Sequence, residues 1–347
     1  MLPRRFPPNK PDGNHVTTQD RCLRHRRQSE MKTSERNLGH PGMGPRLTRK
    51  AFLKGSAAAA GLLAAGGIGG FASDARAANI AMRAIPKSGE KIPAIGVGTA
   101  WIYDVPPGDP KMPVLKKTLE TFINMGGSVI DSSPTYGRAE AVVGQLLAEL
   151  GMRDKAFIAT KISTKGEKEG VESVADSMKS LKTGKFELLQ VHNIKDTKTQ
   201  LKTIRRLKEE GKVKYVGITV SSKRRYDRFA KIMETEPLDF IQINYSLGQP
   251  DSADRILPLA KDKGIAVLIN RPFWKGQLFR KTKGKTLPPW AAEFDCKSWA
   301  QFFLKFSISH PAVTAAIPGT DKPQYMVDNL GAAMGRMPDA KTQAKML

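Results

Sequence analysis

The sequence contains very little cysteine, with only Cys22 and Cys296 among its 347 residues. Cys22 lies in an N-terminal segment, described below, that we leave out of the folded domain. Cys296 then has no partner for an intrachain disulfide. No group of Cys and His residues has the spacing of metal ligands, so the sequence predicts no metal site. A disulfide-stabilised fold and a metal centre are therefore not expected.

Acidic residues are also scarce, since 33 Asp and Glu stand against 57 Lys and Arg and give a formal charge of +24. Residues 1–78 hold 14 Lys and Arg against 5 Asp and Glu, or +9, which leaves +15 for the rest of the chain. This excess either favours acidic substrates and anionic surfaces or reflects only solvated helix faces. Nucleic-acid binding is not expected, because the basic residues are spread along the chain without clustered aromatic residues.

The apolar stretch near the N-terminus, residues 55–71, is short and made mostly of Gly and Ala. TRKAFLK precedes it at residues 48–54, and ARA follows at residues 75–77. A basic patch, a weakly hydrophobic core and a small-residue cleavage site predict a secretory signal peptide over residues 43–77. It resembles a twin-arginine signal in which Lys50 replaces the second arginine. Residues 1–42 are polar and aperiodic, so we expect them to be disordered or to precede the true start.

The signal predicts a periplasmic protein that the twin-arginine translocase exports. Because that route moves folded proteins, a cofactor bound in the cytoplasm would travel inside the fold. Two alternatives stay open. A Sec substrate would cross unfolded and arrive without cofactor, and an uncleaved signal would form a membrane anchor, for which the apolar run is short.

What the sequence does contain, from residue 78 onward, is a regular alternation of apolar runs with amphipathic stretches. Eight runs rich in Val and Ile predict buried parallel strands, namely residues 94–99, 128–132, 157–162, 186–192, 213–219, 239–246, 266–271 and 314–319. Helices are predicted between and after them, over residues 113–125, 140–150, 170–181, 199–210, 226–234, 253–263, 298–309 and 323–333. Eight βα units in about 250 residues predict a (β/α)8 TIM barrel. Residues 81–93 are expected to form a β-hairpin that closes its N-terminal mouth, and residues 78–347 a single monomeric domain.

Four side chains with useful chemistry follow successive predicted strands: Asp131 and Tyr136 in SVIDSSPTYG, Lys161 in FIATKIS and His192 in LLQVHN. Each alone is more simply explained as a helix cap, a turn or a solvated charge. Together they lie at the C-terminal strand ends, where barrel active sites are found. Lys161 is expected to lower the pKa of the Tyr136 phenol.

The remaining two groups complete a proton-transfer site. Asp131 is expected to keep Lys161 charged and oriented, and His192 to hydrogen-bond the substrate oxygen. Such a set moves a proton to or from a carbonyl oxygen but supplies no hydride. A reduced nicotinamide would have to bring the hydride.

Eight motifs between about residues 80 and 334 occur in the order found in the aldo/keto reductases, which the chain resembles: IGVGTAW, SVIDSSPTYG, IATKI, QVHN, VGITVSS, IQINYSL, INRPF and IPGTDKPQYMVDNL. The resemblance implies an NAD(P)H-dependent oxidoreductase that reduces an aldehyde or ketone. The family's catalytic tetrad corresponds to Asp131, Tyr136, Lys161 and His192, with Tyr136 as the general acid. The resemblance also implies a set of cofactor-binding residues, namely Thr99, Thr219, Gln242, Asn270, Arg271, Gly319, Thr320, Tyr325 and Asn329.

Several cofactor positions depart from the family pattern. Gln242 and Thr219 match residues that hold the nicotinamide carboxamide, but Val220 stands in place of an asparagine. Asn270 stands where an aromatic ring usually stacks on the nicotinamide, and Arg271 beside it suits the cofactor diphosphate.

At the 2′-phosphate positions, Gly319, Thr320 and Tyr325 replace a lysine, a serine and an arginine. Thr320, Lys322 and the amides at the next helix start are the alternative phosphate ligands. Asn329 matches the adenine contact. NADP(H) is therefore predicted over NAD(H) because the family prefers it.

Trp101 and Trp274, with Phe279, are the candidate walls of an apolar substrate pocket, and the loop from residue 274 to 296 is long enough to form a lid. A small carbonyl compound is the expected substrate, and its identity stays open. Two further functions also stay open: a nicotinamide-binding sensor or partner subunit with little turnover, and a barrel that has lost its cofactor and serves as a binding scaffold.

Overall fold

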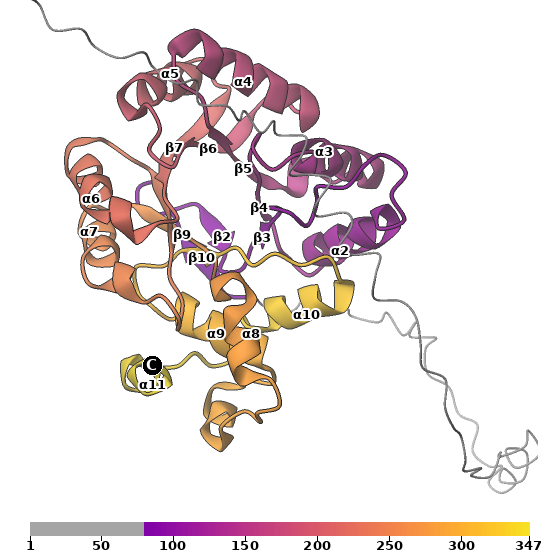
Figure 1. Cartoon of the computed structure of the whole chain (residues 1–347), viewed down its shortest axis with the longest axis vertical. Helices are drawn as coiled ribbons and strands as arrows, with labels where there is room; N and C mark the ends of the chain where they lie inside the picture. Colours follow the sequence, from indigo (N-terminus) through magenta and orange to yellow (C-terminus); the bar gives the residue numbers. More distant parts are fainter. Residues whose placement is uncertain (1–79) are drawn as a thin grey trace, which may run out of the picture. The chain divides into compact units, whose positions relative to one another are not determined.

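The computed structural model of the protein describes residues 80–347 (Figure 1). The predicted signal peptide at residues 43–77 and the predicted disordered start at residues 1–42 lie outside the described residues. Within residues 80–347, no helix is both long enough and apolar enough to span a membrane.

Eight parallel strands form the centre of the fold, in the order β10-β9-β8-β7-β6-β5-β4-β3. They are β3 (Val97–Gly98), β4 (Val129–Asp131), β5 (Phe157–Ile162), β6 (Phe186–His192), β7 (Val213–Thr219), β8 (Phe240–Asn244), β9 (Ala266–Asn270) and β10 (Ala315–Ala316). The first and last strands meet through a parallel bridge between Ile95 and Ala316. The Ala316 amide donates to the Ala94 carbonyl at 2.9 Å, and the Gly96 amide donates to the Ala316 carbonyl at 2.8 Å. These bonds close the sheet, and the predicted barrel is confirmed.

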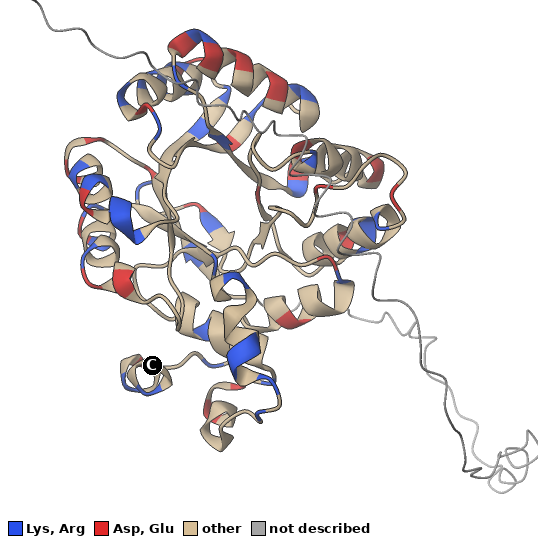
Figure 2. Ribbon diagram, in the orientation of Figure 1, with Lys and Arg blue, Asp and Glu red and all other residues tan. Residues whose placement is uncertain are grey.

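Helices surround this sheet, and most connect one strand to the next (Figure 1). They are α2 (Met112–Asn124), α3 (Ala139–Leu150), α4 (Glu167–Ser180), α5 (Thr197–Glu209), α6 (Tyr226–Thr235), α7 (Ile256–Asp262), α8 (Gln277–Thr282), α9 (Trp299–Ile308), α10 (Pro323–Gly331) and α11 (Ala340–Met346). In α5, for example, Leu201, Ile204 and Leu207 recur at helical spacing and are buried. Lys, Arg, Asp and Glu lie mainly on the outer helices and loops (Figure 2).

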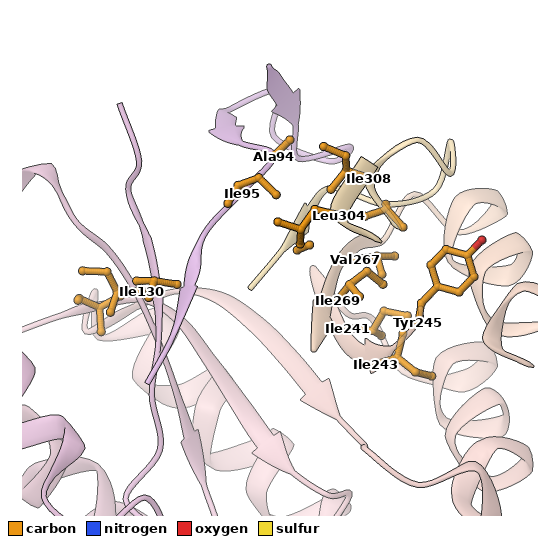
Figure 3. Packing of buried hydrophobic residues seen from close by; sticks show 14 of the residues in the cluster. Ala94, Ile95, Ile130, Ile241, Ile243, Tyr245, Val267, Ile269, Leu304 and Ile308 are labelled. Atoms are coloured by element: carbon orange, nitrogen blue, oxygen red, sulfur yellow. The ribbon is translucent and has the colours of Figure 1, made fainter. Parts of the chain in front are cut away.

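The strands are apolar on both faces because helices cover the outer face and other strand side chains cover the inner face. Outward-facing residues such as Ile241 and Ile269 belong to the same buried cluster as Leu304 and Ile308 of α9 (Figure 3). Inward-facing residues form a second cluster inside the barrel that contains Phe157 and other strand side chains. Burial on both faces explains why these runs read as continuously apolar in the sequence.

The N-terminal mouth of the barrel is closed as predicted by an antiparallel hairpin, β1 (Met82–Ala84) and β2 (Lys91–Pro93). Ile85 and Ile92 of this segment join the inner cluster. There they lie with Phe157, Tyr215 and Phe240, whose ring centroids are 5.4 to 6.1 Å apart. The N-terminal half of the barrel interior is therefore filled by a packed apolar core. A functional site inside the barrel must then lie at the C-terminal ends of the strands.

Some boundaries differ from the sequence-based predictions. Helix α4 begins at Glu167 rather than at residue 170, since Glu167 and Glu169 place negative charge in its first turn, where the helix dipole favours it. The segment 274–296 is not a bare loop: it contains α8 and a 3-10 helix at Pro289–Phe294. The C-terminal α11 is not predicted from the sequence, and Asp339 caps its start by accepting from the Thr342 amide.

Candidate active site

A cleft of about 500 Å³ opens at the C-terminal ends of the strands. It brings together residues from β4, β6, β7, β8 and β9 and from the loops that follow β3, β4, β6, β7, β9 and β10. Ten of the predicted site residues line it: Thr99, Trp101, Asp131, Tyr136, His192, Thr219, Gln242, Asn270, Arg271 and Gly319. Lys161 lies just beneath the cleft, in contact with Asp131.

Asp131 and Lys161 form a buried ion pair at the base of this cleft. Lys161 Nζ lies 2.8 Å from Asp131 Oδ2 and also donates to the Ser132 carbonyl at 2.6 Å. The two residues are only 2% and 1% exposed. The second carboxylate oxygen, Oδ1, accepts from Gln242 Nε2 at 2.6 Å and from Gln190 Nε2 at 3.4 Å. A pair whose remaining lone pairs and protons are satisfied in this way tolerates burial.

Tyr136 lies beside this pair, with Lys161 Nζ 5.0 Å from the centre of its ring. Burial raises the pKa of Tyr136 above its ordinary value, and the Lys161 charge offsets this only in part. Lys161 therefore lowers the pKa of the phenol, as expected, but burial outweighs the nearby ammonium and the net direction is upward. Burial lowers the pKa of Lys161 itself, but Asp131 and Tyr136 together outweigh burial and raise it. Both groups are therefore protonated at neutral pH.

His192 faces Tyr136 across the cleft, with the two rings edge to face and their centroids 6.1 Å apart. Burial and the charges of Lys161, Arg225 and Lys195 lower the pKa of His192 to about 3, so the imidazole is neutral. Its Nδ1 lies 2.5 Å from the Ser163 hydroxyl. With Ser163 as donor to Nδ1, the ring carries its proton on Nε2. His192 is then a neutral hydrogen-bond donor, as the predicted role requires.

Amide and hydroxyl side chains occupy the opposite wall of the cleft. Thr219 Oγ1 donates to Gln242 Oε1 at 3.2 Å, and Asn270 Nδ2 donates to the Val220 carbonyl at 3.2 Å. Asn270 Oδ1 is buried without a hydrogen-bond partner among the described residues. Arg271 has a left-handed backbone, with φ 53°, and its guanidinium donates to the Ser221 carbonyl at 2.7 Å.

The residues present fit a nicotinamide carboxamide. That group offers amide N–H donors, and the unpaired Asn270 Oδ1 is an acceptor that burial makes costly to leave unsatisfied. Glycines also let two backbone segments beside the cleft approach closely. A Cβ added at Gly98 would lie 2.9 Å from the Ile317 carbonyl oxygen, and one at Gly319 would lie 3.1 Å from the Gly98 carbonyl oxygen. Thr99 joins the first and second strand ends by donating to the Asp131 carbonyl at 3.0 Å.

Three predicted cofactor residues do not line the cleft but lie further along the chain, just before and within α10. Thr320 is buried, and its Oγ1 accepts from the Lys322 amide at 3.3 Å. Tyr325 is half exposed, and Lys322 Nζ lies 5.2 Å from the centre of its ring. Asn329 is buried on α10. Lys322 therefore lies among the predicted phosphate and adenine contacts.

Of the aromatic residues predicted to line the substrate pocket, one lies at the cleft and two do not. Trp101 stands at the rim of the cleft and is 79% exposed, with a left-handed backbone. Trp274 and Phe279 do not line the cleft. Trp274 packs partly against the core, and Phe279 packs on Phe273 with the two rings tilted and their centroids 4.8 Å apart. Phe273 itself lines the cleft, so these rings support its wall.

Sequence reasoning missed several polar residues of the site. Ser163 is the main partner of His192, and Thr135, Asn193, Ser221 and Lys275 line the cleft. Ser163 lies one residue beyond the end of β5, two residues after Lys161. Its position just past a strand end is the one signal in the sequence that pointed to it.

Comparison with known proteins agrees with this geometry. Residues 94–344 match the sequence model of the aldo/keto reductase family. The chain is 28% identical over 212 residues to the aldo-keto reductase YhdN of Bacillus subtilis, across 57% of this chain and 63% of that relative, which is less than two thirds of its length. It is 25% identical over 268 residues to the aldo-keto reductase str7 of Strobilurus tenacellus, across 66% and 79% of the two chains.

Solved structures share the fold. An aldo/keto reductase from Klebsiella pneumoniae in complex with NADP and acetate superposes with a TM-score of 0.66 at 21% identity, covering 76% of this chain and 93% of that one. The glycerol dehydrogenase AKR11B4 from Gluconobacter oxydans gives 0.65 at 22% identity over the same shares. With a family match over most of its length, the chain belongs to the aldo/keto reductase family.

Proposed function

We propose that this protein reduces an aldehyde or ketone to an alcohol, with Tyr136 as the proton donor. The observation that carries the proposal is the buried Asp131–Lys161 pair directly beneath the Tyr136 phenol, with the neutral His192 facing it across one cleft. A bound reduced nicotinamide supplies the hydride. This chain's own residues supply the proton and stabilise the charge that develops on oxygen.

The proton moves from the phenol oxygen of Tyr136 to the carbonyl oxygen of the substrate. Because burial keeps the phenol protonated, the donor is present at neutral pH. Lys161 stabilises the phenolate left behind, and Asp131 holds Lys161 charged. His192 donates from Nε2 to the same carbonyl oxygen and fixes the orientation of the substrate.

The nicotinamide would be held by Gln242, Thr219 and Asn270, with the unpaired Asn270 oxygen as acceptor for its carboxamide. The Arg271 guanidinium would bind the diphosphate of the cofactor. NADP(H) is the preferred dinucleotide. Structures of similar fold were solved with NADP and with NADPH, and Lys322 at the start of α10 offers a cation for the 2′-phosphate. The test is to titrate the protein with each dinucleotide and to obtain the two affinities from the change in intrinsic protein fluorescence.

Tyr136→Phe tests the proposed function, using Tyr215→Phe at the far end of the barrel as the matched control. Removing the phenolic proton should lower kcat by about 10³-fold. The affinity for NADPH, measured by calorimetry, should change little. Retained turnover in Tyr136→Phe would overturn the role of this residue. A wild-type protein that completes one turnover and then holds its nucleotide would indicate a sensor instead.

We further propose that the chain is exported to the periplasm with its nucleotide already bound, through the signal at residues 43–77. Support comes from the TRKAFLK and ARA sequences and from a cofactor that the cytoplasm provides. The test is to purify the protein from the periplasm, determine its N-terminus and measure released NADP(H) and NAD(H) by mass spectrometry. Stoichiometric nucleotide agrees with export of a folded complex. An empty protein would favour the Sec route.

A further inference from the structure

A second cavity, of about 690 Å³, adjoins the active-site cleft. Thr135, His192 and Asn193 line both spaces, so that the imidazole stands at their common border. We call this second space the basic cavity. Its other lining residues come from the segments after β5, β6 and β7, and they are Ser163, Lys165, Ile194, Lys195, Asp196, Arg224, Arg225 and Arg228.

The charge of the basic cavity is strongly one-sided, because five cationic side chains face a single carboxylate. That carboxylate, Asp196, is already engaged by the Gly166 amide at 2.9 Å and by the Thr199 hydroxyl at 2.9 Å. Within residues 80–347, none of the five cations forms an ion pair with an acidic side chain. Lys223, beside this cavity, is by contrast paired with Asp251.

Two of the cations are held at the border with the active site. Lys195 Nζ donates to the Ser163 carbonyl at 2.7 Å, and Arg225 donates to the Asn193 carbonyl at 2.7 Å. Their charges reach the reaction centre, since both contribute to the lowered pKa of His192. Positive charge therefore extends from the basic cavity to the group that meets the substrate oxygen.

The basic cavity lies away from the predicted 2′-phosphate and adenine contacts, although its three arginines follow β7, which ends at the predicted nicotinamide contact Thr219. The strand order places β6, which carries His192, four positions from β10, after which Gly319 and Thr320 follow. In a closed barrel of eight strands this is the opposite side. The cations of the basic cavity are thus placed to meet the substrate rather than the phosphates of a dinucleotide.

We propose that the natural substrate is an anionic carbonyl compound, which places its carbonyl group between Tyr136 and His192 and its carboxylate or phosphate in the basic cavity. The inference rests on the proposed reductase function and narrows its substrate class. Arg224 and Arg228 present planar forks of donors that suit either anion. Lys165 and Lys195 add charge that raises the local concentration of anionic substrates.

Two matched pairs of substrates test this assignment and separate the two anions. Succinic semialdehyde is compared with its methyl ester, and glyceraldehyde 3-phosphate with glyceraldehyde. The wild type should show a kcat/KM at least about tenfold higher for the anionic member of one pair at low salt, and added KCl should reduce this preference. The pair with the larger ratio identifies carboxylate or phosphate. Equal kcat/KM values within both pairs would overturn the proposal and leave the reductase function intact.

The double variant Arg224→Gln/Arg228→Gln tests whether the preference for anionic substrates arises in the basic cavity. It should reduce the ratio of anionic to neutral kcat/KM by about tenfold. The control Arg206→Gln/Arg255→Gln removes the same charge from exposed arginines outside the basic cavity and should keep the ratio. An equal fall of the ratio in both variants would contradict a specific site, because it would show a general effect of net charge.

A separate binding measurement covers the case in which the proposed function fails and no carbonyl compound is reduced. Calorimetric titration of the wild type with succinate and with inorganic phosphate measures anion binding without turnover. Binding of either anion that the double variant weakens by about tenfold, and the control retains, supports the basic cavity as an anion site. Absence of binding, together with absence of anionic preference, rejects it.

Discussion

The two ends of the barrel interior are built from the same strands but hold opposite kinds of side chain. At the N-terminal end, Phe157, Tyr215 and Phe240 pack with the hairpin residues into an apolar cluster. At the C-terminal end, Asp131 and Lys161 are as deeply buried, in a network of charges and amides. Depth of burial alone therefore does not show what a residue does. The apolar end stabilises the fold, and the polar end is stable only while its partners remain paired.

Breaking the charge pair should have the largest effect on both stability and activity. Asp131→Asn leaves the Lys161 ammonium buried without its counterion, which should lower the free energy of unfolding by about 3–5 kcal/mol. The double variant Asp131→Asn/Lys161→Met removes both charges and should recover part of this loss, while turnover stays abolished. Urea unfolding and a reductase assay measure the two properties. A double variant less stable than either single variant would contradict this view of the pair.

A truncation at the apolar end should lower the free energy of unfolding about as much as Asp131→Asn does, but it should change kcat little. Phe240→Ala removes a fully buried ring that packs on Phe157 and Tyr215. We expect the free energy of unfolding to fall by about 3–5 kcal/mol. The kcat of the folded fraction should stay near that of the wild type, and measuring it well below the melting temperature checks this. A fall in kcat as large as that of Tyr136→Phe would show that the two ends are not independent.

The two ends should also respond differently to pH. Because the folded pKa of His192, about 3, lies below its ordinary value of 6.5, the unfolded chain binds the proton more readily. The stability that His192 contributes is then complete above about pH 6.5 and declines as the pH falls toward about 3. His192→Gln should flatten this decline in unfolding experiments between pH 4 and 7. Since the pKa of His310 is also lowered by burial, His310→Gln, remote from the cleft, should flatten the decline as well.

The rim of the cleft should show the smallest effects. Trp101 is 79% exposed, so Trp101→Ala should change the free energy of unfolding by less than about 0.5 kcal/mol. Loss of its apolar surface should raise KM for apolar aldehydes by about fivefold if the ring contacts substrate. Steady-state kinetics with a short and a long aldehyde measure this difference. An unchanged KM for both would remove Trp101 from the substrate site.

Much of this arrangement was predictable from the sequence, because the signals are local. Asp131, Lys161 and His192 each lie at or next to the C-terminal end of a mostly apolar strand, and a closed barrel gathers such positions at one edge. The hairpin, too, was visible in a short segment before the first strand.

The contacts that the sequence did not reveal depend on how the chain is folded in space. Ser163 follows a strand like any loop serine, and only the three-dimensional structure brings it to His192. The pKa of Tyr136 could not be predicted either, since its direction depends on burial that outweighs the Lys161 charge. The five cations of the basic cavity come from three separate segments, after β5, β6 and β7, and their spread along the chain hid their convergence.

The seam between Ile95 and Ala316 has a consequence for the order in which the protein is made. It joins residues more than two hundred positions apart, so the ribosome must synthesise almost the whole chain before the ring of strands can close. Non-local pairing of this kind forms late and slowly. Until then the nascent chain exposes the edges of β3 and of the growing sheet. A dinucleotide that binds across this ring can therefore be captured only after synthesis is nearly complete.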